Sequence, residues 1–225
     1  MLVWILLVAQ VAIYLTSRFL IKNKIVKKIL FLASIVLIAV WTVDYGIDTW
    51  LSFYVWPLLV AIFQGYGLYF LSLLVVGTRL TKENLFPFRC FKFKGKLKTA
   101  LRKESLRNIF SSSYEELLYR WFLQNALYVI TKHAVVSIAI TVIVFTAIHY
   151  RKNIAIVQMT DIFLVSLVIT VGFYFAANPI YSIIMHLIRN QLVICQKYVT
   201  VQNENERRAK YFKLLRERKM QEHEQ

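Results

Sequence analysis

The chain has 225 residues, of which 58% are hydrophobic and 18% are charged, and its formal net charge is +16. A soluble domain averages about 45–50% apolar residues, so this composition favours an integral membrane protein. High charge combined with high hydrophobicity requires apolar spans separated by basic loops. Nucleic-acid-binding proteins are not built from long uncharged runs, so the composition argues against nucleic acid and for membrane lipid as a partner.

Seven apolar runs follow one another along the chain, and a spanning helix needs about 20 such residues. The dipeptide Asn178-Pro179 predicts a turn between the last two runs. We therefore predict an all-α polytopic bundle of about seven transmembrane helices. Residues 1–195 would form the membrane domain, with a motif-bearing core at 112–195, and residues 196–225 a basic cytoplasmic tail. The runs lie at 2–20, 29–43, 50–77, 112–130, 134–150, 154–176 and 179–195.

The basic residues are distributed unevenly between the two sets of loops. Of the 28 Lys and Arg, 25 lie in one set, whereas the opposite set holds Lys132 alone. Because cytoplasmic loops carry the excess of Lys and Arg, the N-terminus is predicted outside and the C-terminus inside a multi-pass cell-membrane protein. Cys90 and Cys195 are far apart in the sequence and fall on the predicted cytoplasmic side, where thiols stay reduced.

The fourth run opens with "SSSYEELLYR", which places charge where a membrane helix should be apolar. Ser112 with Glu115, and Ser113 with Glu116, fit the S-x-x-E capping box, which predicts a helix start at this point. Glu116 and Arg120 are four residues apart, in the favourable order for an ion pair. That pair would neutralise Glu116 and leave Glu115 free.

Two further runs carry polar residues at helical spacing. Phe145 and His149 share one helical face, as do His186 and Asn190. The predicted topology brings these groups and Glu115 into one inner-leaflet layer, open to the cytoplasm. Two structural alternatives remain: a histidine at headgroup level, and an interhelical hydrogen bond.

Two other charged groups are expected to play structural roles. Arg189 is predicted to snorkel to the headgroups. Asp161 is predicted to hydrogen-bond within the bundle, or to support the site from behind.

The chemistry of these groups suits hydrolysis. A carboxylate and a histidine can activate a water as general base, and a second histidine with an asparagine can donate to a developing oxyanion. The sequence has no G-x-S-x-G motif, and neither cysteine is paired with a histidine.

The segments "EELLYR", "FTAIH" and "HLIRN" resemble the EExxxR, FxxxH and HxxxN motifs of the CAAX-protease and bacteriocin-processing (CPBP, or Abi) family of intramembrane endopeptidases. The resemblance implies that Glu115 and His149 activate the water and that His186 and Asn190 form the oxyanion hole. Arg120 would hold Glu116, and Phe145 would pack beside His149. The implied substrate is a peptide precursor or a lipidated protein, cleaved near the cytoplasmic face.

Three alternatives stay open at this stage. Zn²⁺ could be held by Glu115, His149 and His186, although the sequence has no H-E-x-x-H motif. A non-catalytic bacteriocin immunity or interaction protein could use the same scaffold. A haem or ion-conducting protein could use His149 and His186, but this would leave the glutamates and Asn190 unexplained.

Overall fold

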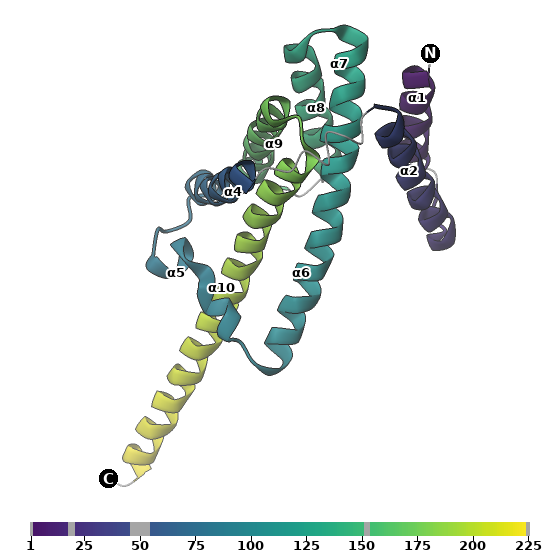
Figure 1. Cartoon of the computed structure of the whole chain (residues 1–225). Helices are drawn as coiled ribbons and strands as arrows, with labels where there is room; N and C mark the ends of the chain where they lie inside the picture. Colours follow the sequence, from purple (N-terminus) through teal and green to yellow (C-terminus); the bar gives the residue numbers. More distant parts are fainter. Residues whose placement is uncertain (1, 18–20, 46–54, 151–153, 224–225) are drawn as a thin grey trace.

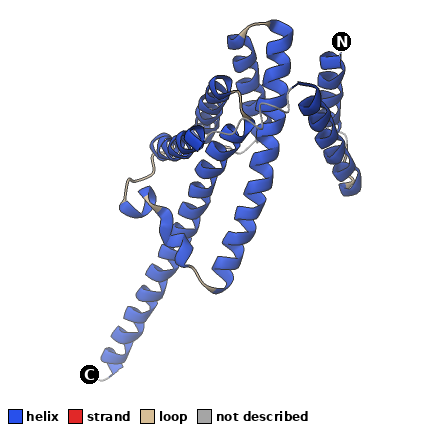
Figure 2. Ribbon diagram, in the orientation of Figure 1, coloured by secondary structure: helices blue, strands red, loops and turns tan. Residues whose placement is uncertain are grey.

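The computed structural model describes residues 2–17, 21–45, 55–150 and 154–223, and within these ranges the chain is helical with no strand (Figure 2). Each of the seven apolar runs overlaps a helix, so the all-α prediction is confirmed. Arg18, Arg151 and Lys152, which contribute to the predicted basic loops, lie outside the described residues. The helices are α1 (Leu2–Leu15), α2 (Lys24–Tyr45), α4 (Val55–Val75), α5 (Lys82–Leu85), η2 (Pro87–Lys92), α6 (Gly95–Glu116), η3 (Leu117–Gln124), α7 (Asn125–Thr131), α8 (Ala134–His149), α9 (Ile156–Ala176) and α10 (Pro179–His223).

Three described helices are long and apolar enough to cross a membrane: Lys24–Asp44, Trp56–Val75 and Ile156–Ala176. Leu2–Ile13 and Ala134–His149 are shorter apolar helices. Only 17–33% of each long candidate is buried inside the protein, so most of its apolar surface faces outward, as a lipid environment requires. The chain is therefore a multi-pass membrane protein, whereas seven spans and their orientation stay predictions.

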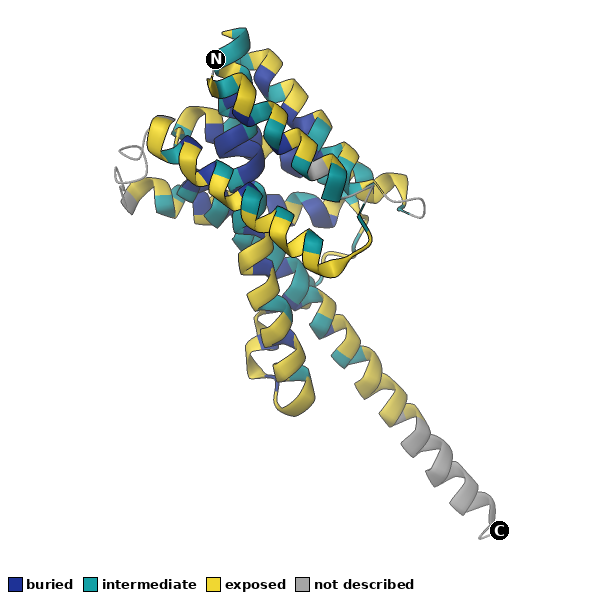
Figure 3. Ribbon diagram, turned by 90° about the vertical axis from the view of Figure 1, so that its right-hand side faces the viewer, coloured by how far each residue is buried: buried dark blue, intermediate teal, exposed yellow. Residues whose placement is uncertain are grey.

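The long helix α10 organises the bundle. It contacts α4, α6 and α9, while α8 packs on α9 and the α1–α2 pair meets η3 through α2 (Figure 1). The buried residues gather where these helices converge, and residues 95–107 of α6 and 200–209 of α10 are mostly exposed (Figure 3). α10 continues without a break through residue 195, where we predicted that the membrane domain ends.

The expected helix start at Ser112 and Ser113 is wrong. α6 begins 17 residues earlier, after Lys94, and Gly95 takes a positive φ of 58° at this start. Helix contacts with α10 explain the difference, because Leu101 of α6 is buried against Cys195 and Val199. The polar stretch 95–107 is rich in Lys, Leu and Arg, which favour a helix, and packing against α10 adds the tertiary support that a helix needs.

The turn predicted at Asn178-Pro179 is present. α9 ends at Ala176, and the next residue, Ala177, has a left-handed φ of 50°. The Asn178 side chain then accepts a hydrogen bond from the backbone N–H of Ile180 at 2.9 Å, which caps the start of α10. This turn sets the direction from which α10 returns into the bundle.

Gly65 allows α4 and α10 to cross closely. A Cβ at this position would lie 2.7 Å from the carbonyl oxygen of Met185 and 2.8 Å from Cβ of Ile188. The Gly65→Ala substitution is therefore expected to destabilise the protein by about 1–3 kcal/mol, because the helices must separate. The measurement is thermal unfolding in detergent. Gly67→Ala is the matched control, since a Cβ there meets nothing within 4 Å; equal stability of the two variants would contradict the packing argument.

Cys90 and Cys195 are distant in sequence but share one buried cluster with Phe93, Leu101 and Val199. Both are free and about 1% exposed. Burial, with a hydrogen bond to Cys195, raises the pKa of the Cys90 thiol to about 12. The folded thiol therefore keeps its proton at pH values at which an unfolded one ionises.

Both thiols are expected to resist maleimide at neutral pH until the protein unfolds, because they are inaccessible and Cys90 is not a thiolate. Between pH 9 and about 12 the Cys90 thiol keeps its proton in the folded protein but loses it in the unfolded chain. The free energy of unfolding should therefore fall as pH rises through this window. Counting labelled thiols by mass spectrometry during denaturant titration checks the first point. Thr99→Cys, at an exposed position on α6, supplies a fast-labelling control; equally fast labelling of the native pair would refute the prediction.

Candidate active site

The centre of the bundle is crossed by one continuous helical run from α6 through η3 to α7. The middle segment, η3 (Leu117–Gln124), is a π-helix, a form that is rare and frequent at functional sites. Six of its eight residues are buried, so nearly every direction around the helix meets another element. Glu115 and Glu116 stand immediately before this segment, and Arg120 lies within it.

Glu116 is completely buried and contacts two cationic or ionisable partners through one oxygen. Its Oε1 lies 3.0 Å from Nη1 of Arg120 and 2.6 Å from Nδ1 of His186 on α10. The ion pair with Arg120 is the one that the four-residue spacing predicts. His186 shares the same oxygen, a contact between α6 and α10 that the spacing within one helix does not predict. Oε2 of Glu116 is also buried and has no hydrogen-bond partner among the described residues.

Arg120 is fully buried, and each of its nitrogens is directed at an acceptor. Nε donates to Oγ1 of Thr170 at 3.3 Å, and Nη2 donates to Oγ of Ser166 at 3.0 Å, both on α9. The guanidinium also lies 4.2 Å from the ring centroid of Phe145. Arg120 therefore ties η3 to α9 and α8, and it holds Glu116 in one position.

Glu115 faces a different helix from its neighbour. Its Oε2 lies 3.9 Å from Nε2 of His149 at the end of α8. Side-chain exposures of 27% for Glu115 and 32% for His149 leave both groups accessible, unlike Glu116. Nδ1 of His149 lies 2.8 Å from the backbone oxygen of Phe145, which can only accept. Nδ1 therefore carries a proton, and in the neutral ring the lone pair of Nε2 points toward Glu115.

Phe145 connects the two carboxylate–histidine contacts. Its ring lies 4.4 Å from that of His149 and 6.3 Å from that of His186, measured between centroids. Tyr119 of η3 packs against the same ring edge-on at 5.3 Å. Phe145 thus lies beside His149, as the motif resemblance implies, and it separates the two histidines with an apolar face.

Asn190 lies one turn beyond His186 and faces α6 one turn before Glu116. Its Nδ2 donates to Oγ of Ser112 at 3.2 Å, and Ser112 donates onward to Oδ1 of Asn108 at 2.9 Å. The antiparallel α6 and α10 therefore make two neighbouring polar contacts, Glu116 with His186 and Ser112 with Asn190. Sequence reasoning did not single out a role for Ser112 beyond helix capping, although its four-residue spacing from Glu116 could have indicated the shared face.

Arg189 does not reach the headgroups, contrary to expectation. Its guanidinium is only 15% exposed and pairs with Asp161 of α9. Nη1 also donates to Oδ1 of Asn190 at 2.8 Å. The expected intrabundle hydrogen bond of Asp161 is therefore present, with Arg189 as its partner.

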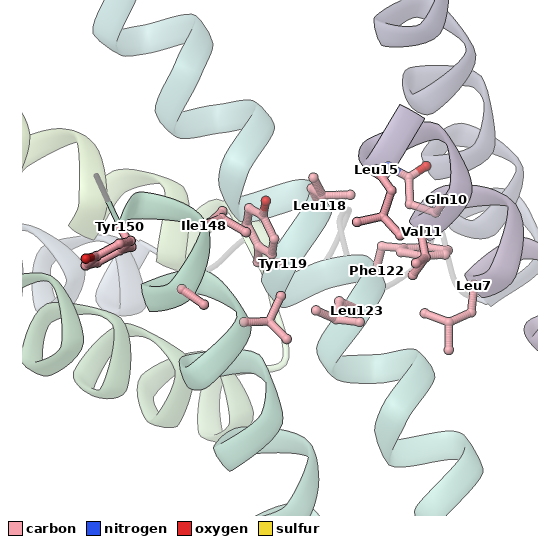
Figure 4. Close-up of a pocket in the computed structure, with 12 residues that line it drawn as sticks. Leu7, Gln10, Val11, Leu15, Leu118, Tyr119, Phe122, Leu123, Ile148 and Tyr150 are labelled. Carbon is pink, nitrogen blue, oxygen red and sulfur yellow. The ribbon is translucent and has the colours of Figure 1, made fainter. Parts of the chain in front are cut away.

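An apolar cavity of about 550 Å³ lies beside the site (Figure 4). α1, η3 and α8 line it, and Tyr119 stands between this cavity and Phe145. Figure 4 shows Leu7, Gln10 and Val11 of α1 opposite Leu118, Tyr119 and Phe122 of η3. The cavity could accommodate an aliphatic chain next to the polar groups.

The zinc hypothesis finds no matching ligand set. Within the described ranges, no three His, Cys, Asp or Glu side chains gather as metal ligands. Glu115 faces His149, whereas His186 faces Glu116, so the trio Glu115, His149 and His186 does not converge on one point. We therefore derive no step through a metal.

The fold and the site together define a class of protein: a helical membrane protein with two carboxylate–histidine contacts at its centre. Residues 106–192 match the family model described as "Rce1-like: Type II CAAX prenyl endopeptidase Rce1-like", so this part of the chain is similar to that protease family. The matched range contains all seven motif residues named above. Comparison with curated proteins and with solved structures gives no match.

Proposed function

We propose that the protein is an intramembrane endopeptidase that hydrolyses a peptide bond in a peptide precursor or lipidated protein near the cytoplasmic face. The observation that carries the proposal is the contact of Glu115 with His149, two accessible groups whose facing atoms are 3.9 Å apart. A water hydrogen-bonded to both atoms would sit at ordinary distances of about 2.8 Å from each. Such a water is the nucleophile of the reaction.

In the proposed mechanism, Glu115 takes a proton from this water while the lone pair of His149 Nε2 orients it. The oxygen then attacks the scissile carbonyl carbon, and a tetrahedral oxyanion forms. When the carbon–nitrogen bond breaks, Glu115 returns its proton to the leaving amine. The hydrogen bond from His149 Nδ1 to the Phe145 carbonyl supports this role, because it keeps Nε2 unprotonated in the neutral ring.

His186 and Asn190 stabilise the oxyanion. An ionised Glu116 can only accept a hydrogen bond, so Nδ1 of His186 donates in their contact. When the ring is an imidazolium, its other nitrogen, Nε2, also carries a hydrogen and can donate to the oxyanion. Asn190 supplies an amide N–H from the same helix. Arg120 and Glu116 are positioning residues in this scheme, and Phe145 holds both rings. The cavity beside Tyr119 supports a substrate with an apolar segment or lipid chain.

The test is mass spectrometry of candidate peptides and lipidated peptides incubated with purified wild-type protein and with Glu115→Ala. We expect two product fragments from the wild type and none above background from the variant, because the general base is gone. Membrane insertion and thermal unfolding of Glu115→Ala should match the wild type, since the side chain is partly exposed. Full cleavage by the variant would reject Glu115 as the base.

The alternative, a non-catalytic bacteriocin immunity or interaction protein, predicts a different outcome. Protection of cells would survive Glu115→Ala, and no fragment would appear with either protein. The assay therefore separates hydrolysis from binding.

A further inference from the structure

Three helices converge on the guanidinium of Arg189. Asp161 of α9 pairs with Nη2, and Ser72 of α4 accepts from Nε at 3.1 Å and from Nη2 at 3.0 Å. The remaining nitrogen, Nη1, donates to Asn190. The proposed mechanism uses Asn190 but assigns no task to Arg189 or Asp161. A charged pair that is 85–90% removed from solvent is costly to place in a membrane bundle and calls for a reason.

The contact with Arg189 determines whether Oδ1 or Nδ2 of the Asn190 side-chain amide faces the guanidinium. A guanidinium can only donate, so the amide must present Oδ1 to it. If the amide turned over, its NH₂ group would face a second donor 2.8 Å away. Arg189 therefore excludes the reversed orientation and directs Nδ2 toward α6, where it meets Ser112.

This direction matters because α6 carries the glutamates. Ser112 lies one turn before Glu116, and Asn190 lies one turn after His186. The Asn190 N–H and the His186 ring thus project from α10 toward the same helix. An oxyanion donor acts through fixed direction, since a donor that must rotate into place loses much of its benefit.

We propose that Arg189 is a positioning residue: held in place by its ion pair with Asp161, it locks the Asn190 amide so that Nδ2–H is available to the developing oxyanion. The inference rests on the proposed function, in which Asn190 is an oxyanion donor. The charge of Arg189 is balanced by Asp161, so the assembly orients the amide without adding net charge beside the reaction.

The first experiment is a double-mutant cycle on the cleaved peptide, with Arg189→Lys, Asn190→Ala and the double variant. Lysine keeps the charge for Asp161 but lacks the planar fork that reaches Ser72 and Asn190 at the same time. We expect Arg189→Lys to lower kcat roughly 10- to 100-fold with KM within twofold. In the Asn190→Ala background the same substitution should change kcat less than twofold. If Arg189→Lys lowered kcat by the same factor with and without Asn190→Ala, the two residues would act independently, and the positioning role would be overturned.

Ser72→Ala is the matched control for loss of a guanidinium contact other than those with Asp161 and Asn190. It removes one acceptor of the guanidinium and leaves the contacts with Asp161 and Asn190 in place, so kcat should stay within threefold of the wild type. A loss as large as that of Arg189→Lys would indicate a general packing effect and would also count against the inference. Thermal unfolding of each variant measures the folded fraction used to normalise kcat.

A second readout does not depend on activity. The side-chain amide signals of Asn190 in ¹⁵N-asparagine-labelled protein can be assigned by their loss in Asn190→Ala. Arg189→Lys should shift or broaden this pair of signals, while Ser72→Ala should leave it close to its wild-type position. Unchanged signals in Arg189→Lys would refute the orientation argument even if the protease proposal holds. Shifted signals in a protein that cleaves nothing would instead place the failure with the proposed function.

Discussion

Replacing Arg120 with methionine is expected to lower the free energy of unfolding by about 3–5 kcal/mol, the usual effect of removing one partner of a buried ion pair. The side chain is wholly buried, and its loss would leave the buried Glu116 carboxylate without its permanently charged partner, with only the contact to His186 remaining among the described residues. Ser166 and Thr170 would also lose their donors. The measurement is denaturant or thermal unfolding in detergent, together with the yield of inserted protein.

Two comparisons make this prediction specific. Arg107→Met removes an arginine that is 77% exposed, and it should change stability by less than about 0.5 kcal/mol. Adding Glu116→Gln to Arg120→Met should recover part of the loss, because the buried carboxylate charge is then gone. If Arg120→Met were as stable as Arg107→Met, the buried pair would not hold the centre of the bundle together.

Alanine substitutions of the two site histidines are expected to have the largest effects on activity. His149→Ala should lower kcat about 10²- to 10⁴-fold, because it removes the group that orients the water. His186→Ala should lower kcat about 10²- to 10³-fold through loss of an oxyanion donor. Single-turnover cleavage of the peptide identified by mass spectrometry gives both rates.

The chain supplies its own control for the histidine series. His133 is exposed in the connection before α8, and its replacement by alanine should leave kcat within twofold of the wild type. KM should change little in all three variants, since none of the three rings is assigned to substrate binding. Full activity of His149→Ala would reject the water-activating pair, and full activity of His186→Ala would reject the oxyanion assignment.

Local patterns were sufficient to predict the helices and several of the contacts. The apolar runs predicted where helices lie, because a bilayer demands long uninterrupted apolar stretches. The four-residue spacing of Glu116 and Arg120 predicted their ion pair, since residues at this distance share a helical face. The roles of Glu115, His149, His186 and Asn190 stay predictions until activity is measured.

The features that the sequence could not reveal depend on contacts between helices. Glu115 and Glu116 are adjacent, and no local rule says which one meets His149 and which one meets His186. The extent of α6 depends on burial of Leu101 against α10, which the polar sequence around it does not indicate. Arg189 looked like a snorkelling residue because Asp161, its partner, is 28 positions away.

The π-helical segment also determines the direction in which the two glutamates face. A π-helix accommodates more residues per turn than an α-helix, so η3 sets the angular phase between α6 and α7. If the segment took ordinary α-helical bonding at the same chain length, each residue that the wide turn absorbs would rotate everything before it by about 100° relative to α7. Glu115 and Glu116 would then turn away from α8 and α10 together. The hydrogen-bonding pattern of this segment thus matters to the site as much as the identity of the residues it orients.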